Sequence, residues 1–274
     1  MSSGDRIAST FERLRKEGRA GLVTFVTAGD PDPGTSQQLM ERLPDAGADI
    51  IELGMPFSDP MADGPAIQAA NLRALASGAS LIGTLDMVRR FRENNSDTPV
   101  ILMGYFNPIY QYGPSRFVTD AVSAGVDGLI MVDLPPEEDE ELCDPARTAG
   151  LHWVRLVTPT SNEGRLKQVL QNTSGFIYYV SIAGITGTRS AAASSIGEAL
   201  TTVRKHTQLP IAVGFGINTA EQVRETGEVA DGAVVGSAII REIENNLDES
   251  GRAKPELLDR VTGLVSTLSG GLRS

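Results

Sequence analysis

The sequence predicts a single (β/α)8 barrel, the TIM barrel, with one extra helix at its N-terminus. Three observations support this prediction: eight short apolar segments recur along the 274 residues, helical patterns alternate with them, and several of those helices end at a Gly just before the next strand. Nearly continuous apolar strands are typical of parallel sheets covered on both faces. Eight βα units in about 250 residues match the usual size of this barrel.

The predicted strands are rich in Val, Ile, Leu and aromatic residues. They are residues 21–29, 48–56, 98–106, 126–135, 151–159, 175–184, 209–217 and 231–239. Helices are predicted at 5–18 before the first strand, at 35–47, 114–125, 164–171, 195–206 and 219–227 between strands, and at 255–270 after the last. Gly47, Gly125 and Gly150 each follow a helix, where a left-handed residue closes the last turn.

The main alternative to the barrel is an open, doubly wound sheet. No GxGxxG string follows the first strand, and no Pro/Ser-rich linker divides the chain. Both absences argue against a dinucleotide-binding domain joined to a second domain. We therefore expect one domain spanning residues 1–274.

Composition limits the classes of function. The chain has 24 Lys and Arg against 35 Asp and Glu, a net charge of −11, which disfavours nucleic acid and anionic membranes as partners. One Cys and two His provide neither a disulfide nor a Cys/His zinc site. The N-terminus has no apolar signal core, and no run of 18 apolar residues occurs. We expect a cytoplasmic protein with no metal.

Catalytic groups in this barrel lie at the carboxyl ends of the strands. In the second predicted strand, Glu52 alternates with Ile51 and Leu53, so it shares a face with Ile50. If that face points inward, Glu52 enters an apolar barrel mouth, where burial raises its pKa and suits it to proton transfer. The alternative is a Glu on the surface or in an ion pair.

A second carboxylate follows in the next loop. Asp63 precedes Gly64-Pro65, and Pro is favoured in the first turn of a helix, so Asp63 or its neighbour could simply cap that helix. The preceding segment, Pro56 to Pro60 with Asp59 inside it, has a proline at each end that stiffens it.

The last strands end in glycines. Gly216 lies in the string 213–217, and Gly236 with Ser237 opens an apolar, helical segment. Glycines let backbone approach a ligand, and a helix N-terminus offers free N–H groups to an anion, so we expect a phosphate site. Glycines that only form tight turns are the alternative. The small-residue loop after strand six, which contains Gly187, predicts a mobile lid or, alternatively, an ordinary variable loop.

Other residues favour structural roles. His152 begins a strand and should lie at the opposite, amino-terminal face, and Cys143 should be packed in a helix. The acidic run 137–141 should form a solvated first helical turn, since acidic side chains complement the helix dipole there.

Six strings of the sequence, 50–68, 102–109, 125–138, 178–189, 213–217 and 234–239, resemble the tryptophan synthase α subunit family. The string ELGMPFSDPMADGP within the first is highly specific, and the resemblance covers nearly the whole chain. It implies a lyase that cleaves indole-3-glycerol phosphate to indole and glyceraldehyde 3-phosphate by a retro-aldol reaction. The indole would then pass to a β subunit for L-tryptophan synthesis.

The resemblance also implies roles for single residues. Glu52 matches the family's catalytic acid/base, Asp63 the carboxylate that holds the indole N–H, and Tyr178 an active-site tyrosine. The remaining matches are Phe25, Met103, Phe215 and Val234 around the indole, Gly187, Gly216, Gly236 and Ser237 at the phosphate, Thr186 in the lid, and Pro56, Asp59, Asn107 and Pro108 at the β subunit.

By the same resemblance, the chain works in an α2β2 heterotetramer, and pyridoxal phosphate belongs to the β subunit, with no cofactor in this chain. Ile182-Ala183 stands where many members carry more polar lid residues, which affects lid hydrogen bonds and signalling between subunits rather than the chemistry. Three alternatives stay open: a free-standing lyase that releases indole, a non-catalytic regulatory partner of the same fold, and another phosphate-binding barrel isomerase.

Overall fold

The fold was analysed in a computed structural model, which describes residues 4–181, 189–214 and 216–273, without the side chains of 189–195. Its strands form one sheet in which every neighbouring pair is parallel. They are β1 (Gly21–Thr27), β2 (Ile50–Gly54), β3 (Val100–Gly104), β4 (Gly128–Met131), β5 (His152–Trp153), β6 (Arg155–Val157), β7 (Ile177–Val180), β8 (Ile211–Gly214) and β9 (Gly232–Val235).

The sheet closes on itself. Its order is β5-β4-β3-β2-β1-β9-β8-β7-β6, and only Val154 separates the two edge strands in the chain. The single strand predicted over 151–159 is therefore divided. Its first part pairs with β4 and its second with β7, so the chain changes partner at Val154. The predicted (β/α)8 barrel is confirmed, with β5 and β6 together filling one of its eight strand positions.

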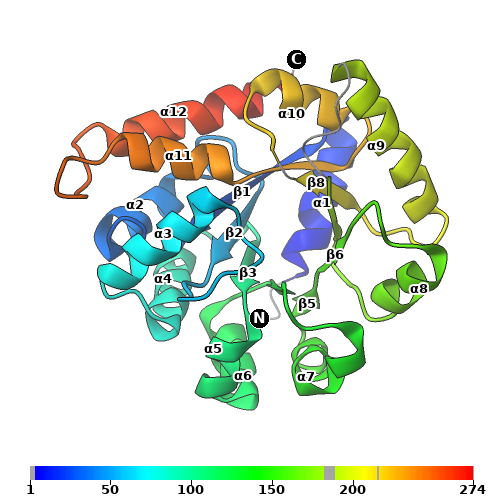
Figure 1. The fold of residues 1–274 in the computed structure, drawn as a ribbon, viewed down its shortest axis with the longest axis horizontal. Helices are drawn as coiled ribbons and strands as arrows, with labels where there is room; N and C mark the ends of the chain where they lie inside the picture. Colours follow the sequence, from blue (N-terminus) through cyan, green and yellow to red (C-terminus); the bar gives the residue numbers. More distant parts are fainter. Residues whose placement is uncertain (1–3, 182–188, 215, 274) are drawn as a thin grey trace.

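Helices surround this barrel (Figure 1). They are α1 (Arg6–Glu17), α2 (Pro33–Arg42), α3 (Pro65–Ala76), α4 (Leu81–Asn94), α5 (Phe106–Tyr112), α6 (Pro114–Ala124), the 3-10 helix η1 (Pro136–Glu141), α7 (Cys143–Thr148), α8 (Glu163–Gln171), α9 (Arg189–Arg204), α10 (Ala220–Gly227), α11 (Ser237–Asn245) and α12 (Leu257–Gly270). Among those described, no helix is long and apolar enough to cross a membrane.

Some boundaries differ from the prediction. The helix expected over 35–47 begins at Pro33 and ends at Arg42, two residues before Pro44, which has no N–H to continue the helical hydrogen bonds. The helix expected from residue 195 already begins at Arg189. The predicted closures at Gly125 and Gly150 are confirmed by positive φ angles of 87° and 94°, and Gly47 has a φ of 108°.

Strand alternation divides the core into two apolar sets. Ile51 and Leu53 pack outward against the helices. Ile50 points into the barrel, where each strand position contributes one residue to an inner apolar cluster: Val23, Ile50, Ile101, Ile130, Val154, Phe176, Ala212 and Val234. Because side chains alternate along a strand, Glu52 also points inward, one step closer to the carboxyl end of β2. The predicted inward direction of Ile50 and Glu52 is confirmed.

The first helix closes the amino-terminal end of the barrel. Ile7, Phe11 and Leu14 of α1 pack against the inner apolar cluster, and the Phe11 and Phe176 ring centroids lie 5.9 Å apart. The predicted structural place of His152 agrees with this, since its Nε2 lies 3.0 Å from the carboxylate of Asp5. This end is therefore occupied by packing, which leaves the opposite mouth for a ligand.

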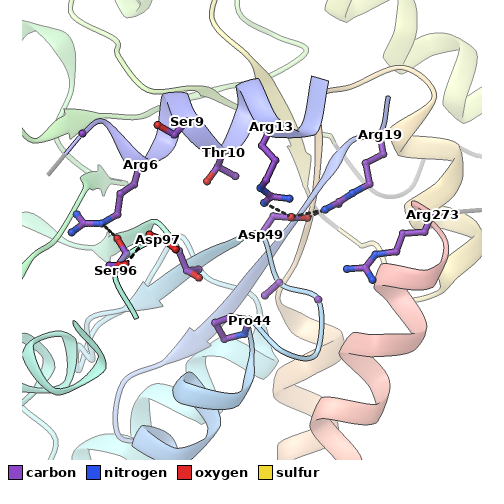
Figure 2. Close-up of a pocket in the computed structure, with 14 residues that line it drawn as sticks. Arg6, Ser9, Thr10, Arg13, Arg19, Pro44, Asp49, Ser96, Asp97 and Arg273 are labelled. Carbon is purple, nitrogen blue, oxygen red and sulfur yellow. Dashed lines mark hydrogen bonds and ion pairs between the residues drawn. The ribbon is translucent and has the colours of Figure 1, made fainter. Parts of the chain in front are cut away.

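Ion pairs fix α1 to the strand starts around a cavity of about 680 Å3 (Figure 2). Asp49 accepts hydrogen bonds from Arg13 at 2.9 Å, from Arg19 at 2.8 and 2.9 Å, and from the Leu22 N–H at 3.0 Å. Burial alone would raise the pKa of Asp49, but these donors hold it below its ordinary value. Arg6 likewise pairs with Asp127 at 2.9 Å, so these three arginines are already compensated.

The acidic run differs from its prediction. Residues 136–141 form η1, and Asp139 within it is buried rather than solvated. Its carboxylate pairs with Arg155, whose Nη1 also donates to the Leu134 carbonyl at 2.8 Å, and it accepts from Asn172 Nδ2 at 2.9 Å. The prediction of a solvated turn is therefore wrong only for Asp139, which pairs with a cation on the neighbouring strand. The other four acidic residues of the run are exposed, as predicted. Cys143 is buried, as predicted.

Candidate active site

A cavity of about 740 Å3 opens at the carboxyl ends of the strands. The structure brings nine of the predicted site residues together around it: Glu52, Asp63, Tyr178, Phe25, Met103, Val234, Gly216, Gly236 and Ser237. They come from six strands or the loops that follow them, as expected of an active site in this fold. Phe215, Thr186 and Gly187 lie outside the described residues.

Glu52 is fully buried at the bottom of this cavity. Its side chain is 0% exposed, and neither carboxylate oxygen has a hydrogen-bond partner among the described residues. Burial without compensation disfavours the charged form and raises the pKa of Glu52 to about 8. The alternative of a surface or ion-paired Glu is wrong. At neutral pH the group is mostly a neutral acid that can give up a proton and take it back.

Asp63 does not cap the helix that follows it. The N-cap of α3 is Gly64, and no side chain bonds to that end of the helix. The Asp63 carboxylate instead accepts a hydrogen bond from the Tyr105 hydroxyl at 3.2 Å. Burial raises its pKa to about 6, although the Tyr105 hydrogen bond opposes the shift. Asp63 is therefore mostly ionised at neutral pH, unlike Glu52, and the two carboxyl groups are suited to different roles.

Tyr178 reaches the cavity from β7. Burial, and then the negative charges of Glu52 and Asp63, raise the pKa of its phenol well above the ordinary value, so the hydroxyl stays protonated. Its ring lies against Gly214 of β8, and any side chain at that position would collide with the phenol. A neutral hydroxyl is thus held beside the two carboxyl groups as a hydrogen-bond donor.

An apolar wall completes this half of the cavity. Phe25, Met103 and Val234 line it. A Cβ at Gly54 would lie 2.7 Å from the Phe25 ring, and one at Gly236 would lie 3.2 Å from the Phe25 Cβ. These two glycines therefore make room for the aromatic ring. Gly236 has a packing role as well as any role toward a ligand.

The other half of the cavity offers backbone donors. Gly216 has a φ of 79°, in the region that favours glycine, and Gly236 is the N-cap of α11. No side chain caps α11, and Ser237 is its first residue. The first N–H groups of a helix have no partner within it, and the helix dipole favours an anion there. This arrangement suits a phosphate group.

Sequence reasoning missed several lining residues. Val132, Leu156 and Thr158 also line the cavity, as do Asn218 and Arg241. Arg241 could have been found, because it stands four residues after Ser237 and so shares its helix face.

Tyr105 was missed as well. It directly follows β3, at the strand end where functional groups gather. Besides donating to Asp63, its hydroxyl accepts from the Ala62 N–H at 3.0 Å.

The residues expected at a partner surface lie outside this cavity. Asp59 and Asn107 are exposed and line a neighbouring cleft of about 580 Å3, with Phe57, Met61 and Tyr105. Pro108 is half-buried and Pro56 is buried, so Pro56 shapes the loop from inside instead of offering surface. Tyr105 lines this cleft, and its hydroxyl contacts Asp63 of the active-site cavity. Its ring centroid lies 5.2 Å from that of Phe57.

Within the described residues, no group of three or more His, Cys, Asp or Glu side chains could hold a metal ion. The chemical groups in the cavity include two carboxyls of different pKa, a phenol, an apolar wall and a helix N-terminus. These groups can bind an anion at one end of the cavity and an apolar ring at the other, and the carboxyls can donate a proton to the bound molecule or accept one from it.

Comparisons with known proteins identify the family of this chain. The family model for the tryptophan synthase alpha chain matches residues 11–266. The crystal structure of tryptophan synthase subunit alpha from Legionella pneumophila str. Paris is 40% identical, with 98% of each chain covered and a TM-score of 0.89. A structure of tryptophan synthase from M. tuberculosis is 31% identical, with 98% of this chain and 99% of that chain covered and a TM-score of 0.86. The chain belongs to the tryptophan synthase alpha chain family.

Proposed function

We propose that the cavity cleaves indole-3-glycerol phosphate with Glu52 as the proton-transfer group, Asp63 at the indole nitrogen, and the N-terminus of α11 at the phosphate. The family's alpha chain is a lyase for this substrate. The single observation that carries the assignment of roles is Glu52, a buried carboxyl group without a hydrogen-bond partner among the described residues, facing a cavity that also contains an ionised Asp63.

The neutral Glu52 donates its proton to C3 of the indole ring, which leaves the ring system positively charged. Asp63 stabilises that charge by accepting a hydrogen bond from the indole N–H. Glu52, now a carboxylate, takes the proton from the glycerol hydroxyl as the C–C bond breaks. The electrons of that bond return to the ring, so the products are indole and glyceraldehyde 3-phosphate, and Glu52 ends protonated again. Each such proton transfer contributes about 10²–10⁴-fold to the rate.

The other site residues follow from this orientation. Phe25, Met103 and Val234, with Phe215, surround the indole. The backbone of Gly216, Gly236 and Ser237, with Gly187, binds the phosphate. The lid role of Thr186 rests on the family resemblance alone. These roles use carboxyl groups and backbone amides, so the proposed reaction gives no step to a cofactor in this chain.

The exposed cleft beside the active site supports a β subunit as partner. Asp59, Asn107 and Pro108 lie at or near this cleft, and Met61 there is 88% exposed, although large apolar side chains are usually buried. In this proposal the β subunit covers the cleft, receives the indole and holds pyridoxal phosphate in its own chain.

An indole-release assay with indole-3-glycerol phosphate, run with and without the β subunit, tests the function. We expect slow release by the chain alone and a strong increase with the β subunit. Asp63→Asn should lower turnover, and an unchanged rate would remove its role. Fast unaided release would instead favour a free-standing lyase.

A further inference from the structure

The active-site cavity is lined by more acidic than basic side chains, which disfavours an anionic substrate. Its described lining carries three acids, Glu52, Asp63 and Glu244, against one cation, Arg241. Burial keeps Glu52 mostly neutral, and Glu244 lies 3.7 Å from Arg73 on α3. Asp63 and Arg241 are therefore the two charged groups of the lining that are not neutralised by burial or by a nearby ion pair, and they have opposite sign.

Arg241 is placed at the phosphate end by its position in α11. It stands four residues after Ser237, the first residue of this helix, so both side chains share one helix face. Its guanidinium is exposed and forms no ion pair with a carboxylate among the residues that the structure describes. Its positive charge is thus available at the rim of the cavity.

A chain of hydrogen bonds connects Arg241 to the loop after β8. Arg241 Nη2 donates to the side-chain oxygen of Asn218, and Asn218 Nδ2 donates to the Gly216 carbonyl at 2.5 Å. The Asn218 N–H in turn donates to Gln222 of α10 at 2.7 Å. Arg241 therefore joins the two backbone segments, around Gly216 and around Ser237, that make up the expected phosphate site.

We propose that Arg241 is the cationic member of the phosphate subsite, which attracts the substrate's phosphate and holds the Gly216 loop against α11 through Asn218. The proposal rests on the phosphate orientation given above. A helix N-terminus supplies only about half a unit charge, whereas the substrate's phosphate carries up to two negative charges. In a chain of net charge −11, a local cation offsets the repulsion that this anion meets as it approaches.

The effect should appear in binding and not in chemistry. Arg241→Gln should raise KM about five- to tenfold, because an exposed charge–phosphate contact has this magnitude. It should leave kcat within about twofold, because Arg241 takes no part in the proposed proton transfer. The inhibition constant of glycerol 3-phosphate should rise by the same factor. Inhibition by indole, which has no phosphate, should not change.

Two further variants distinguish the effect of the Arg241 charge from a general effect of replacing an exposed arginine. Arg241→Lys keeps the charge and should stay within about twofold of the parent in KM. Arg224→Gln is the matched control, since Arg224 is an exposed arginine on α10 that pairs with Glu228 and does not line the cavity. Higher ionic strength should raise the KM of the parent more than that of Arg241→Gln.

The proposal is overturned if Arg241→Gln keeps its KM and its glycerol 3-phosphate inhibition constant within twofold, or if Arg241→Lys loses as much as Arg241→Gln. Failure of the proposed function looks different, because the unmodified protein would then release no indole from indole-3-glycerol phosphate. The inhibitor measurement is repeated as direct calorimetric binding of glycerol 3-phosphate, which needs no turnover.

Discussion

Glu52 and Asp63 stand eleven positions apart in the sequence, yet their surroundings give them different protonation states. Glu52 is buried without a partner, and its pKa rises to about 8. Asp63 has a hydroxyl donor, and its pKa rises only to about 6. One acid and one carboxylate therefore coexist at neutral pH, which is what a reaction that protonates carbon beside a developing positive charge requires.

The buried Glu52 should make folding stability depend on pH. Its pKa is about 8 in the folded chain against 4.5 as the ordinary value, so its contribution is full below pH 4.5 and is lost as pH rises toward 8. The loss is at most about 1.4 kcal/mol per pH unit. Glu52→Gln should lack this loss, as measured by urea unfolding of both proteins at pH 5, 6.5 and 8. Parallel stability curves would contradict the raised pKa.

Tyr105 should lower the pKa of Asp63. Its hydroxyl hydrogen bond lowers the pKa of the Asp63 carboxylate against the effect of burial. Tyr105→Phe removes this donor, so the pKa of Asp63 should rise and the acidic limb of the kcat profile should move to higher pH. Tyr112→Phe is a suitable control, because Tyr112 bonds to Asp120 away from the cavity. An unmoved limb would mean that Asp63 does not set it.

At the scale of elements, the alternation of side chains along β2 was enough to predict the direction of Glu52. Ile50 points inward, so the side chain two positions later points inward as well. Gly216 and Gly236 could be placed at the same end of the barrel, since each comes near the end of one of the last two predicted strands. The Tyr105–Asp63 and Arg155–Asp139 contacts were not predictable. They join segments whose relative placement depends on how loops pack, and no local pattern records that.

Helix α1 should contribute stability without touching the chemistry. Phe11 is buried against Phe176 at the end of the barrel opposite the active-site cavity. Phe11→Ala should therefore cost about 3–5 kcal/mol of unfolding free energy and leave kcat unchanged at a temperature where the protein is folded. Glu12→Ala on the exposed face of the same helix should change stability by no more than about 0.5 kcal/mol. Equal effects of the two changes would contradict this packing.

At the scale of the whole molecule, the barrel separates three surfaces. The amino-terminal end is closed by α1, the carboxyl-terminal mouth holds the cavity, and the cleft around Asp59 and Met61 lies beside that mouth. The count of βα units predicted the barrel, because strand number and spacing are recorded in the apolar pattern. The division of one strand at Val154 was not predicted, because it reflects a change of pairing partner and not a change of composition.

The cleft should matter only when the β subunit is present. Met61→Lys places a charge on an exposed apolar side chain of this cleft, so it should raise the β-subunit concentration needed for half-maximal activation about tenfold. The unaided rate should not change. Leu72→Lys provides the control, since Leu72 is also exposed but lines neither the cavity nor the cleft. Activation that is equally sensitive to both changes would place the partner elsewhere.

The central claim is that Glu52 moves the proton in the cleavage. The most direct test measures indole release by Glu52→Gln with saturating indole-3-glycerol phosphate and β subunit, together with calorimetric binding of glycerol 3-phosphate. We expect no detectable indole and a binding affinity close to that of the parent, because Gln fills the same space without an exchangeable acid and the phosphate is held by other residues. A substantial rate of indole release by this variant would contradict the claim.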